Sequence, residues 1–118
     1  MSELKMKRIF EKAEAEDGFR ILVDRLWPRG VKKESAHIDL WLKDIAPSPD
    51  LRKWFAHDKD KFAAFKARYI EELETEPEKQ KAVEQVKERL ENGVVTLVYA
   101  AKDEMHNHVK VLKEYIER

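Results

Sequence analysis

Apolar residues gather in three short runs that have the length of β-strands. Residues 6–10 alternate weakly between apolar and polar positions, residues 19–26 contain the uninterrupted run I-L-V, and residues 94–101 have the sequence V-V-T-L-V-Y-A-A. Branched side chains such as valine favour strands, and continuous apolar runs are typical of strands that are covered on both faces. The pattern therefore predicts a short, mostly parallel central sheet.

The stretch between the second and third runs follows helical spacing. Apolar residues recur there at intervals of three and four, and polar capping residues mark where helices begin. The expected N-caps are Ser35, Ser48, Asp58 and Thr75, and a last helix, capped by Asp103, follows the third run. The helix at Ser35 would carry residues 38, 41, 42 and 45 on one face, and the last helix would carry residue 105 on its apolar face.

These elements combine into one domain that spans residues 1–118. A long helical excursion between two strands of one sheet forms a right-handed crossover, so the second and third strands should be parallel neighbours. The direction of the first strand stays open, because the segment after it is short for a covered crossover. We expect a small α/β sandwich with a short, mostly parallel sheet and a long multi-helix crossover between its last two strands.

Composition narrows the range of functions. Of the 118 residues, 42% are hydrophobic and 41% are charged, and 24 basic side chains balance 24 acidic ones. A net charge of zero argues against a dedicated nucleic-acid-binding protein, which normally has a basic excess. The chain has no cysteine, which excludes disulfides, thiolate metal sites and thiol nucleophiles. The charged amino-terminal segment and the lack of a long apolar run predict a cytoplasmic protein with no membrane segment.

Candidate functional residues follow the second and third strands. Ligands of open α/β sheets bind beyond the carboxyl ends of the strands, and these two ends converge if the strands are neighbours. The expected anion-binding residues are Arg25, Trp27, Arg29, Gly30, Lys102 and Asn107, and the expected acid–base residues are Asp24, Asp103 and His106. Cations beside a helix N-terminus favour anions, because unpaired amides and the helix dipole also attract negative charge.

Several of these residues also fit structural roles. Asp24 can pair with Arg25 or with a helix end, Asp103 can serve only as an N-cap, and Trp27 can belong to the core. The histidines at positions 106 and 108 cannot both face one pocket from a helix, because residues two apart point in different directions. The chain lacks a His-x-x-x-His pair and a glycine-rich phosphate loop, so we expect neither a metal nor a cofactor.

The segment L-V-D-R-L-W-P-R-G at residues 22–30 resembles the signature of the YeaO-like proteins, a family defined by a domain of unknown function numbered 488. The resemblance continues through W-L-K at residues 41–43 and T-L-V-Y-A-A-K-D at residues 96–103, and it implies a small α/β protein. Family-type positions in the helical stretch are Lys43, Pro47, Ser48, Arg52 and His57. The resemblance also implies cysteines in longer relatives where this chain has Tyr99 and Asn107, so cysteine chemistry does not carry over here.

Three functions are compatible with these observations. The first is a small enzyme, or a binding protein with enzyme ancestry, that acts on an anionic small molecule such as a nucleotide or a phosphorylated metabolite. In that case Arg25, Arg29 and Lys102 hold the anion, an aspartate is the acid or base, and His106 titrates near neutral pH. The alternative is a nucleic-acid-associated or regulatory protein that uses the same basic corner. A structural or partner-binding domain would instead expose the tryptophans at positions 41 and 54.

Overall fold

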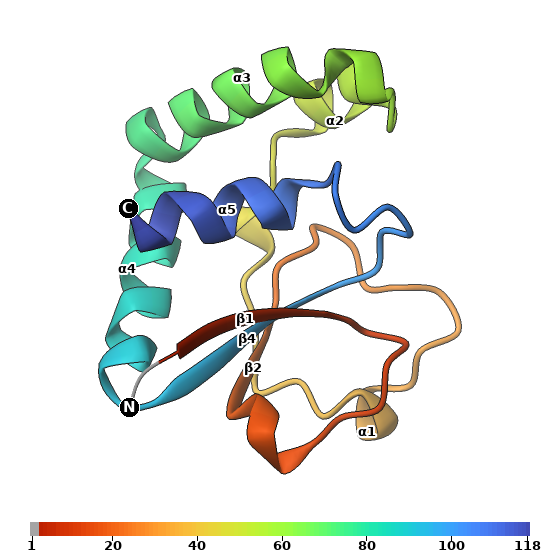
Figure 1. The fold of residues 1–118 in the computed structure, drawn as a ribbon, viewed down its shortest axis with the longest axis vertical. Coiled ribbons are helices and arrows are strands. Elements are labelled where there is room, and N and C mark those ends of the chain that lie inside the picture. Colours follow the sequence, from red (N-terminus) through yellow and green to blue (C-terminus); the bar gives the residue numbers. More distant parts are fainter. Residues whose placement is uncertain (1–2) are drawn as a thin grey trace.

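A four-stranded parallel sheet forms the centre of the molecule (Figure 1). The computed structural model describes residues 3–118. The strands are β1 (Glu3–Arg8), β2 (Phe19–Leu22), β3 (Leu40–Trp41) and β4 (Val94–Tyr99), in the order β1-β4-β2-β3. β2 and β4 are parallel neighbours, which confirms the predicted crossover, and β1 also pairs in parallel with β4. The pairing therefore settles the direction of the first strand.

The segment after Ser35 differs from the prediction. The helix there, α1, covers only Lys33–Ala36, and it ends where His37 takes a left-handed conformation with φ of 51°. The chain then pairs with β2: the amide of Asp39 donates to the carbonyl of Arg20, and the Asp39 carboxylate accepts the Arg20 amide. Pairing with the sheet thus overrides helical spacing, and β3 forms in place of the predicted helix.

Four longer helices complete the fold. They are α2 (Pro49–Phe55), α3 (Phe62–Thr75), α4 (Pro77–Glu91) and α5 (His108–Glu117), and short 3-10 turns lie at Ala15–Asp17, Lys43–Ile45 and Lys59–Lys61. The Ser48 hydroxyl caps α2 as predicted, and Asp58 caps the turn that leads into α3. Thr75, in contrast, is the last residue of α3 and donates its hydroxyl to the Glu71 carbonyl. Glu76 takes the N-cap position of α4 in an extended conformation and makes no side-chain capping bond; a residue that precedes a proline disfavours the helical conformation, so the helix begins at Pro77.

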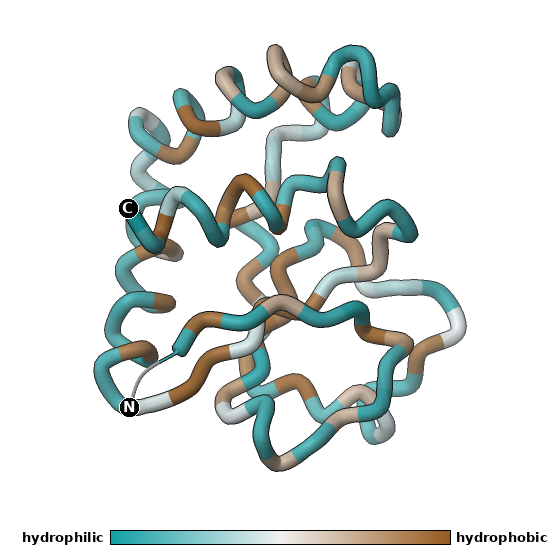
Figure 2. Tube along the Cα trace, viewed as in Figure 1, coloured by the Kyte–Doolittle hydropathy of each residue, from teal (hydrophilic) through white to brown (hydrophobic). Residues whose placement is uncertain are grey.

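The two faces of the sheet are covered by different elements. α3, α4 and α5 pack on one face around the larger core, and Figure 2 shows apolar segments of α4 turned toward the sheet. The loop after β2 and α1 cover the other face, where Ala36 packs with Leu22 and Val98. Trp54 joins the first core and Trp41 the second, and both are half-buried. Among residues 3–118, no helix combines the length and apolar character needed to cross a membrane.

A buried ion network anchors the start of β2. The Asp17 carboxylate accepts hydrogen bonds from Nη1 of Arg20 at 2.6 Å and from Nζ of Lys7 at 2.9 Å. The guanidinium of Arg20 also donates to the carbonyls of Ala36 and His37. Burial acts to raise the pKa of Asp17, but the amide of Glu14 and these two cations lower it below its ordinary value. The network therefore holds Asp17 in its charged form.

Candidate functional site

The carboxyl ends of β2 and β4 are neighbours, and the chain leaves them in different directions. After β2 the chain turns toward the face that carries α1, whereas after β4 it turns toward the opposite face, where α5 packs. Such a point, where neighbouring parallel strands send their connections to opposite faces, is the usual ligand-binding position in open α/β sheets. Asp24 and His108 lie at this position.

Asp24 links the two diverging strands. One carboxylate oxygen, Oδ2, accepts the backbone amide of Ala100 at 2.9 Å, and the backbone carbonyl of Asp24 accepts the indole N–H of Trp41 at 2.8 Å. The preceding residue, Val23, still pairs with β4 through the carbonyl of Val98. These bonds hold the carboxyl group of Asp24 at the edge of the sheet, with 17% of its side chain exposed.

His108, the first residue of α5, faces Asp24. Its Nε2 lies 3.0 Å from the carbonyl of Val23 and 3.5 Å from Oδ1 of Asp24, and its ring stands edge-on to Tyr69. A carbonyl can only accept, so Nε2 carries the hydrogen. The side chain is 16% exposed. His108 was not among the residues predicted for the site, and it is the imidazole that contacts the strand end.

Burial shifts the titration of both members of this pair. It raises the pKa of the Asp24 carboxyl above its ordinary value, and the charges of His108 and Arg52 and the Ala100 amide only partly offset this. Burial also lowers the pKa of His108, against the opposing effects of Asp24 and the Val23 carbonyl. The site therefore favours the neutral imidazole and disfavours the carboxylate.

Two arginines lie on segments next to this pair: Arg25 directly follows Asp24, and Arg52 belongs to α2. Arg25 donates from Nη2 to the carbonyl of Pro47 at 3.3 Å, and its Nε is shielded from solvent without a hydrogen-bond partner among residues 3–118. Arg52 is exposed on α2, and its charge affects the pKa of both Asp24 and His108. Arg25 was predicted for this site from its position after β2. Arg52 was identified only as a position at which the chain matches the YeaO-like family.

Asp103 and His106 form a second, more exposed pair beside the first. Oδ2 of Asp103 lies 3.0 Å from Nδ1 of His106, whose ring stands edge-on to Phe62 at 5.2 Å. Desolvation acts to raise the pKa of Asp103, but the amides of Met105 and His106 and the His106 ring together lower it below its ordinary value. Asp103 therefore caps a turn. The prediction that Asp103 caps the last helix is wrong, because Asn107 caps α5, and Met105 lies exposed outside that helix and not on its apolar face.

The remaining predicted site residues divide into structural and exposed positions. Asn107 is buried and caps α5: its Oδ1 accepts the Lys110 amide, and its Nδ2 donates to the Asp103 carbonyl. Trp27 donates to the carbonyl of Val31 and packs edge-on against Trp41. Arg29, Gly30 and Lys102 are exposed. Within the described residues, the side chains of Arg29 and Lys102 make no hydrogen bond, so both are available to a ligand.

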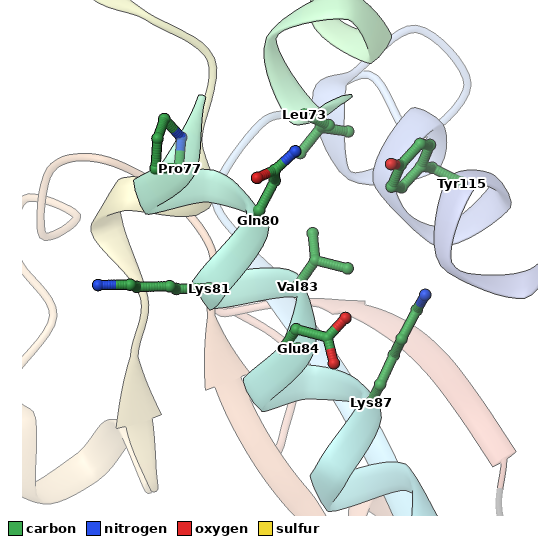
Figure 3. Close-up of a pocket in the computed structure, with 8 residues that line it drawn as sticks. All are labelled: Leu73, Pro77, Gln80, Lys81, Val83, Glu84, Lys87 and Tyr115. Atoms are coloured by element: carbon green, nitrogen blue, oxygen red, sulfur yellow. The ribbon is translucent and has the colours of Figure 1, made fainter. Parts of the chain in front are cut away.

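The described residues show no metal centre at this site. Residues 3–118 contain no cluster of three or more His, Asp or Glu side chains that could hold a metal ion. A cavity of about 480 Å³ lies elsewhere, between α4 and α5, and Figure 3 shows Val83, Leu73 and Tyr115 around it with Lys87 pointing across. None of the residues that line this cavity belongs to the candidate site, so the candidate site at the edge of the sheet is separate from that cavity.

Comparison with known proteins places the chain in a family. The family described as the "Inactive DUF488-N3 subclade" matches residues 3–118. "Uncharacterized protein YeaO" of Escherichia coli (strain K12) is 39% identical over 113 residues, which are 96% of each chain. "Uncharacterized protein Rv3073c" of Mycobacterium tuberculosis is 34% identical over 115 residues, 98% of this chain and 94% of that protein. No solved structure matches. The chain belongs to the YeaO-like DUF488 family, in the subclade described as inactive.

Proposed function

We propose that this protein is a cytoplasmic binding protein for an anionic small molecule, a nucleotide or a phosphorylated metabolite, which it holds at the carboxyl ends of β2 and β4. The description of its subclade as inactive favours binding over turnover. The position at which β2 and β4 send their connections to opposite faces is where open α/β sheets bind ligands, which supports the proposed location.

The proposal rests on one observation, the unused hydrogen-bond donors of the Arg25 guanidinium. It presents five N–H donors, yet only Nη2 has an acceptor among residues 3–118, the Pro47 carbonyl at a long 3.3 Å. Its Nε is buried with no partner at all. Buried donors are normally satisfied, and the remaining N–H groups on Nη1 and Nη2 have no acceptor among residues 3–118, so they are left for an anion. A phosphate or carboxylate supplies two acceptors in the geometry that arginine prefers.

The surrounding charges also suit an anion. Arg52 adds a second cation, and burial disfavours the charged form of Asp24. The nearby carboxylate of Glu72 is occupied by the amide and hydroxyl of Ser48. Arg29 and Lys102, exposed on the flanking loops, would reach the outer part of a larger ligand, and His106 would offer its free Nε2.

Thermal unfolding with a panel of anions tests this proposal. Phosphate, sulfate, nucleoside phosphates and sugar phosphates would be compared, and a ligand at a hundred times its Kd should add about 2.7 kcal/mol of stability. Arg25→Ala should abolish the shift. Lys81→Ala, which removes one positive charge from an exposed position on α4, should leave it unchanged.

Two outcomes would overturn the proposal. The first is that no anion in the panel stabilises the wild-type protein, and the second is that Arg25→Ala binds the anion as tightly as Lys81→Ala does. Binding to a nucleic-acid backbone is a separate outcome with its own signature. It would weaken by about a thousandfold between 50 and 200 mM salt if about six phosphates were contacted.

A further inference from the structure

The charge state of the pair formed by Asp24 and His108 is weakly held. In the network around Asp17, two cations contact the carboxylate and keep it charged. At the end of β2, in contrast, burial raises the pKa of Asp24 and lowers the pKa of His108, so it favours the neutral form of both side chains. The contact between Oδ1 of Asp24 and Nε2 of His108 measures 3.5 Å, which exceeds the roughly 2.7–2.9 Å of a charge-assisted hydrogen bond. A change in the surrounding charge therefore changes how readily this pair holds a proton.

The carboxyl group of Asp24 has one oxygen free to take up a proton. Oδ2 accepts the amide of Ala100, but Oδ1 accepts no hydrogen bond among residues 3–118. In the same residues, Nε of Arg25 is the one unpaired side-chain nitrogen or oxygen that is fully shielded from solvent, so Oδ1 remains in contact with solvent. A proton on Oδ1 consequently leaves the bond to Ala100 intact.

Arginine charges link this carboxyl group to the proposed anion site. Arg25 directly follows Asp24, and consecutive Cα atoms are about 3.8 Å apart. The charge of Arg52, on α2, stabilises the charged form of Asp24 and opposes a charged His108. An anion held by these arginines offsets their charge and adds its own, and both effects favour a neutral, protonated Asp24.

The other titratable groups around the pair do not replace Asp24 in this role. From α3, Tyr69 stands edge-on to His108 with its hydroxyl bonded to a backbone carbonyl, and it stays neutral because burial raises its pKa well above the ordinary value. Glu72, also on α3, is already occupied by an amide and a hydroxyl. His57, which follows α2, opposes a charged His108. Among these groups, Asp24 is therefore the one whose charged form an anion at the arginines disfavours most directly.

We propose that the binding of an anion at this site is coupled to the uptake of one proton by Asp24. The inference rests on the proposed function and adds its regulation by pH. The proton comes from the solvent and binds Oδ1, so the carboxylate becomes a neutral carboxyl group beside the anion. Such linkage is reciprocal: if the anion favours the proton, the proton favours the anion by the same factor. The protein should therefore hold its ligand more tightly as the pH falls.

Calorimetry of sulfate binding between about pH 5 and about pH 8 tests this coupling, because sulfate keeps its own charge over that range. A nearby charge shifts a pKa by about 1–3 units, so the wild-type protein should bind sulfate at least about threefold more tightly at the acidic end. Repetition in buffers of different ionisation enthalpy counts the protons taken up with each sulfate.

Two variants isolate the contribution of Asp24. Asp24→Asn removes the titrating group and keeps an acceptor for the Ala100 amide. This variant should take up no proton and lose the pH dependence, and near neutral pH it should bind sulfate more tightly than the wild type. Glu84→Gln, which removes one negative charge from an exposed position on α4, should keep the pH dependence of the wild type.

Equal sulfate affinity at both ends of the pH range, or binding without proton uptake, would contradict the coupling while the anion site itself stands. An unchanged pH dependence in Asp24→Asn would also contradict it and assign the proton to an imidazole, such as that of His57 or His106. If sulfate binds neither protein at any pH, the coupling fails, and the panel of anions shows whether the proposed function fails with it. The proton count on the wild type decides the matter even if Asp24→Asn does not fold.

Discussion

Asp17 and Asp24 flank β2 and experience opposite electrostatic environments. Asp17, at the start of the strand, contacts two cations and is 6% exposed, and its pKa is lowered. Asp24, at the end of the strand, contacts the Ala100 amide and the ring of His108, whose pKa is lowered by burial. Burial raises the pKa of Asp24 itself. Replacement of each by asparagine removes the charge at nearly constant size, so the two variants compare the environments directly.

The expected effects on the free energy of unfolding differ clearly. Asp17→Asn leaves the buried guanidinium of Arg20 without its charged partner, and loss of one member of a buried pair costs about 3–5 kcal/mol. The asparagine oxygen still accepts one hydrogen bond, so we expect the lower end, about 3 kcal/mol. Asp24→Asn keeps an acceptor for the Ala100 amide and removes a charge that burial disfavours. The free energy of unfolding of Asp24→Asn should be at most about 1 kcal/mol below that of the wild type, or should exceed it.

Urea unfolding at neutral and acidic pH measures both effects. The stabilisation from Asp17 is present above its ordinary pKa of 3.8 and is lost as the pH falls through the lowered value. The pH dependence from Asp24 has the opposite sign. Because its pKa in the folded protein is raised above 3.8, the wild-type protein loses stability as the pH rises from 3.8 through the raised pKa. Any stability that Asp24→Asn gains over the wild type at neutral pH should therefore shrink in acid. A loss in Asp24→Asn as large as that in Asp17→Asn would refute this reasoning.

Two further substitutions test individual assignments. Asn107→Ala should lower stability by about 1–2 kcal/mol, because it removes the cap of α5 and the donor to the Asp103 carbonyl, and Asn107→Ser should recover part of the loss in thermal unfolding. Arg29→Ala should change stability by less than about 1 kcal/mol, because the side chain is exposed and unpaired within the described residues, while it weakens nucleotide binding. A strongly destabilised Arg29→Ala that still binds the nucleotide would place Arg29 in the scaffold.

The central strands were predictable because their signal is local and unambiguous. The run at Val94–Tyr99 is rich in branched residues and is buried between two layers, and a strand of this kind needs no alternation to be detected. β3 is different, because two residues pair with β2 only after the chain has folded around it. The helical spacing of apolar residues at positions 38–45 therefore predicted the wrong conformation, because pairing with β2 determines the structure of this segment.

The sequence indicated which segments lie at the candidate site but not which side chains meet there. The order of elements places Asp24 and the segment after β4 at one sheet edge, where Asp24 accepts the Ala100 amide, whereas the guanidinium of Arg25 donates to Pro47. The charge of Arg52 acts on Asp24 from α2, the first helix of the long helical excursion. No local pattern indicates how α2 is oriented against the sheet, so the contribution of Arg52 depends on the packing of α2 and α3.

The choice between His106 and His108 shows how a helix cap determines the chemistry of this edge. Asp103 and Asn107 are both good capping residues, and only the packing of α5 on the sheet selects Asn107. A start at Asp103 would make His108 an interior helical residue. The start at Asn107 makes His108 the first residue of the helix instead, and its ring meets the carbonyl of Val23. The same choice leaves His106 in a turn with Asp103. Asn107 thus positions the imidazole that lies 3.5 Å from Asp24, although its own side chain bonds only to Lys110 and Asp103.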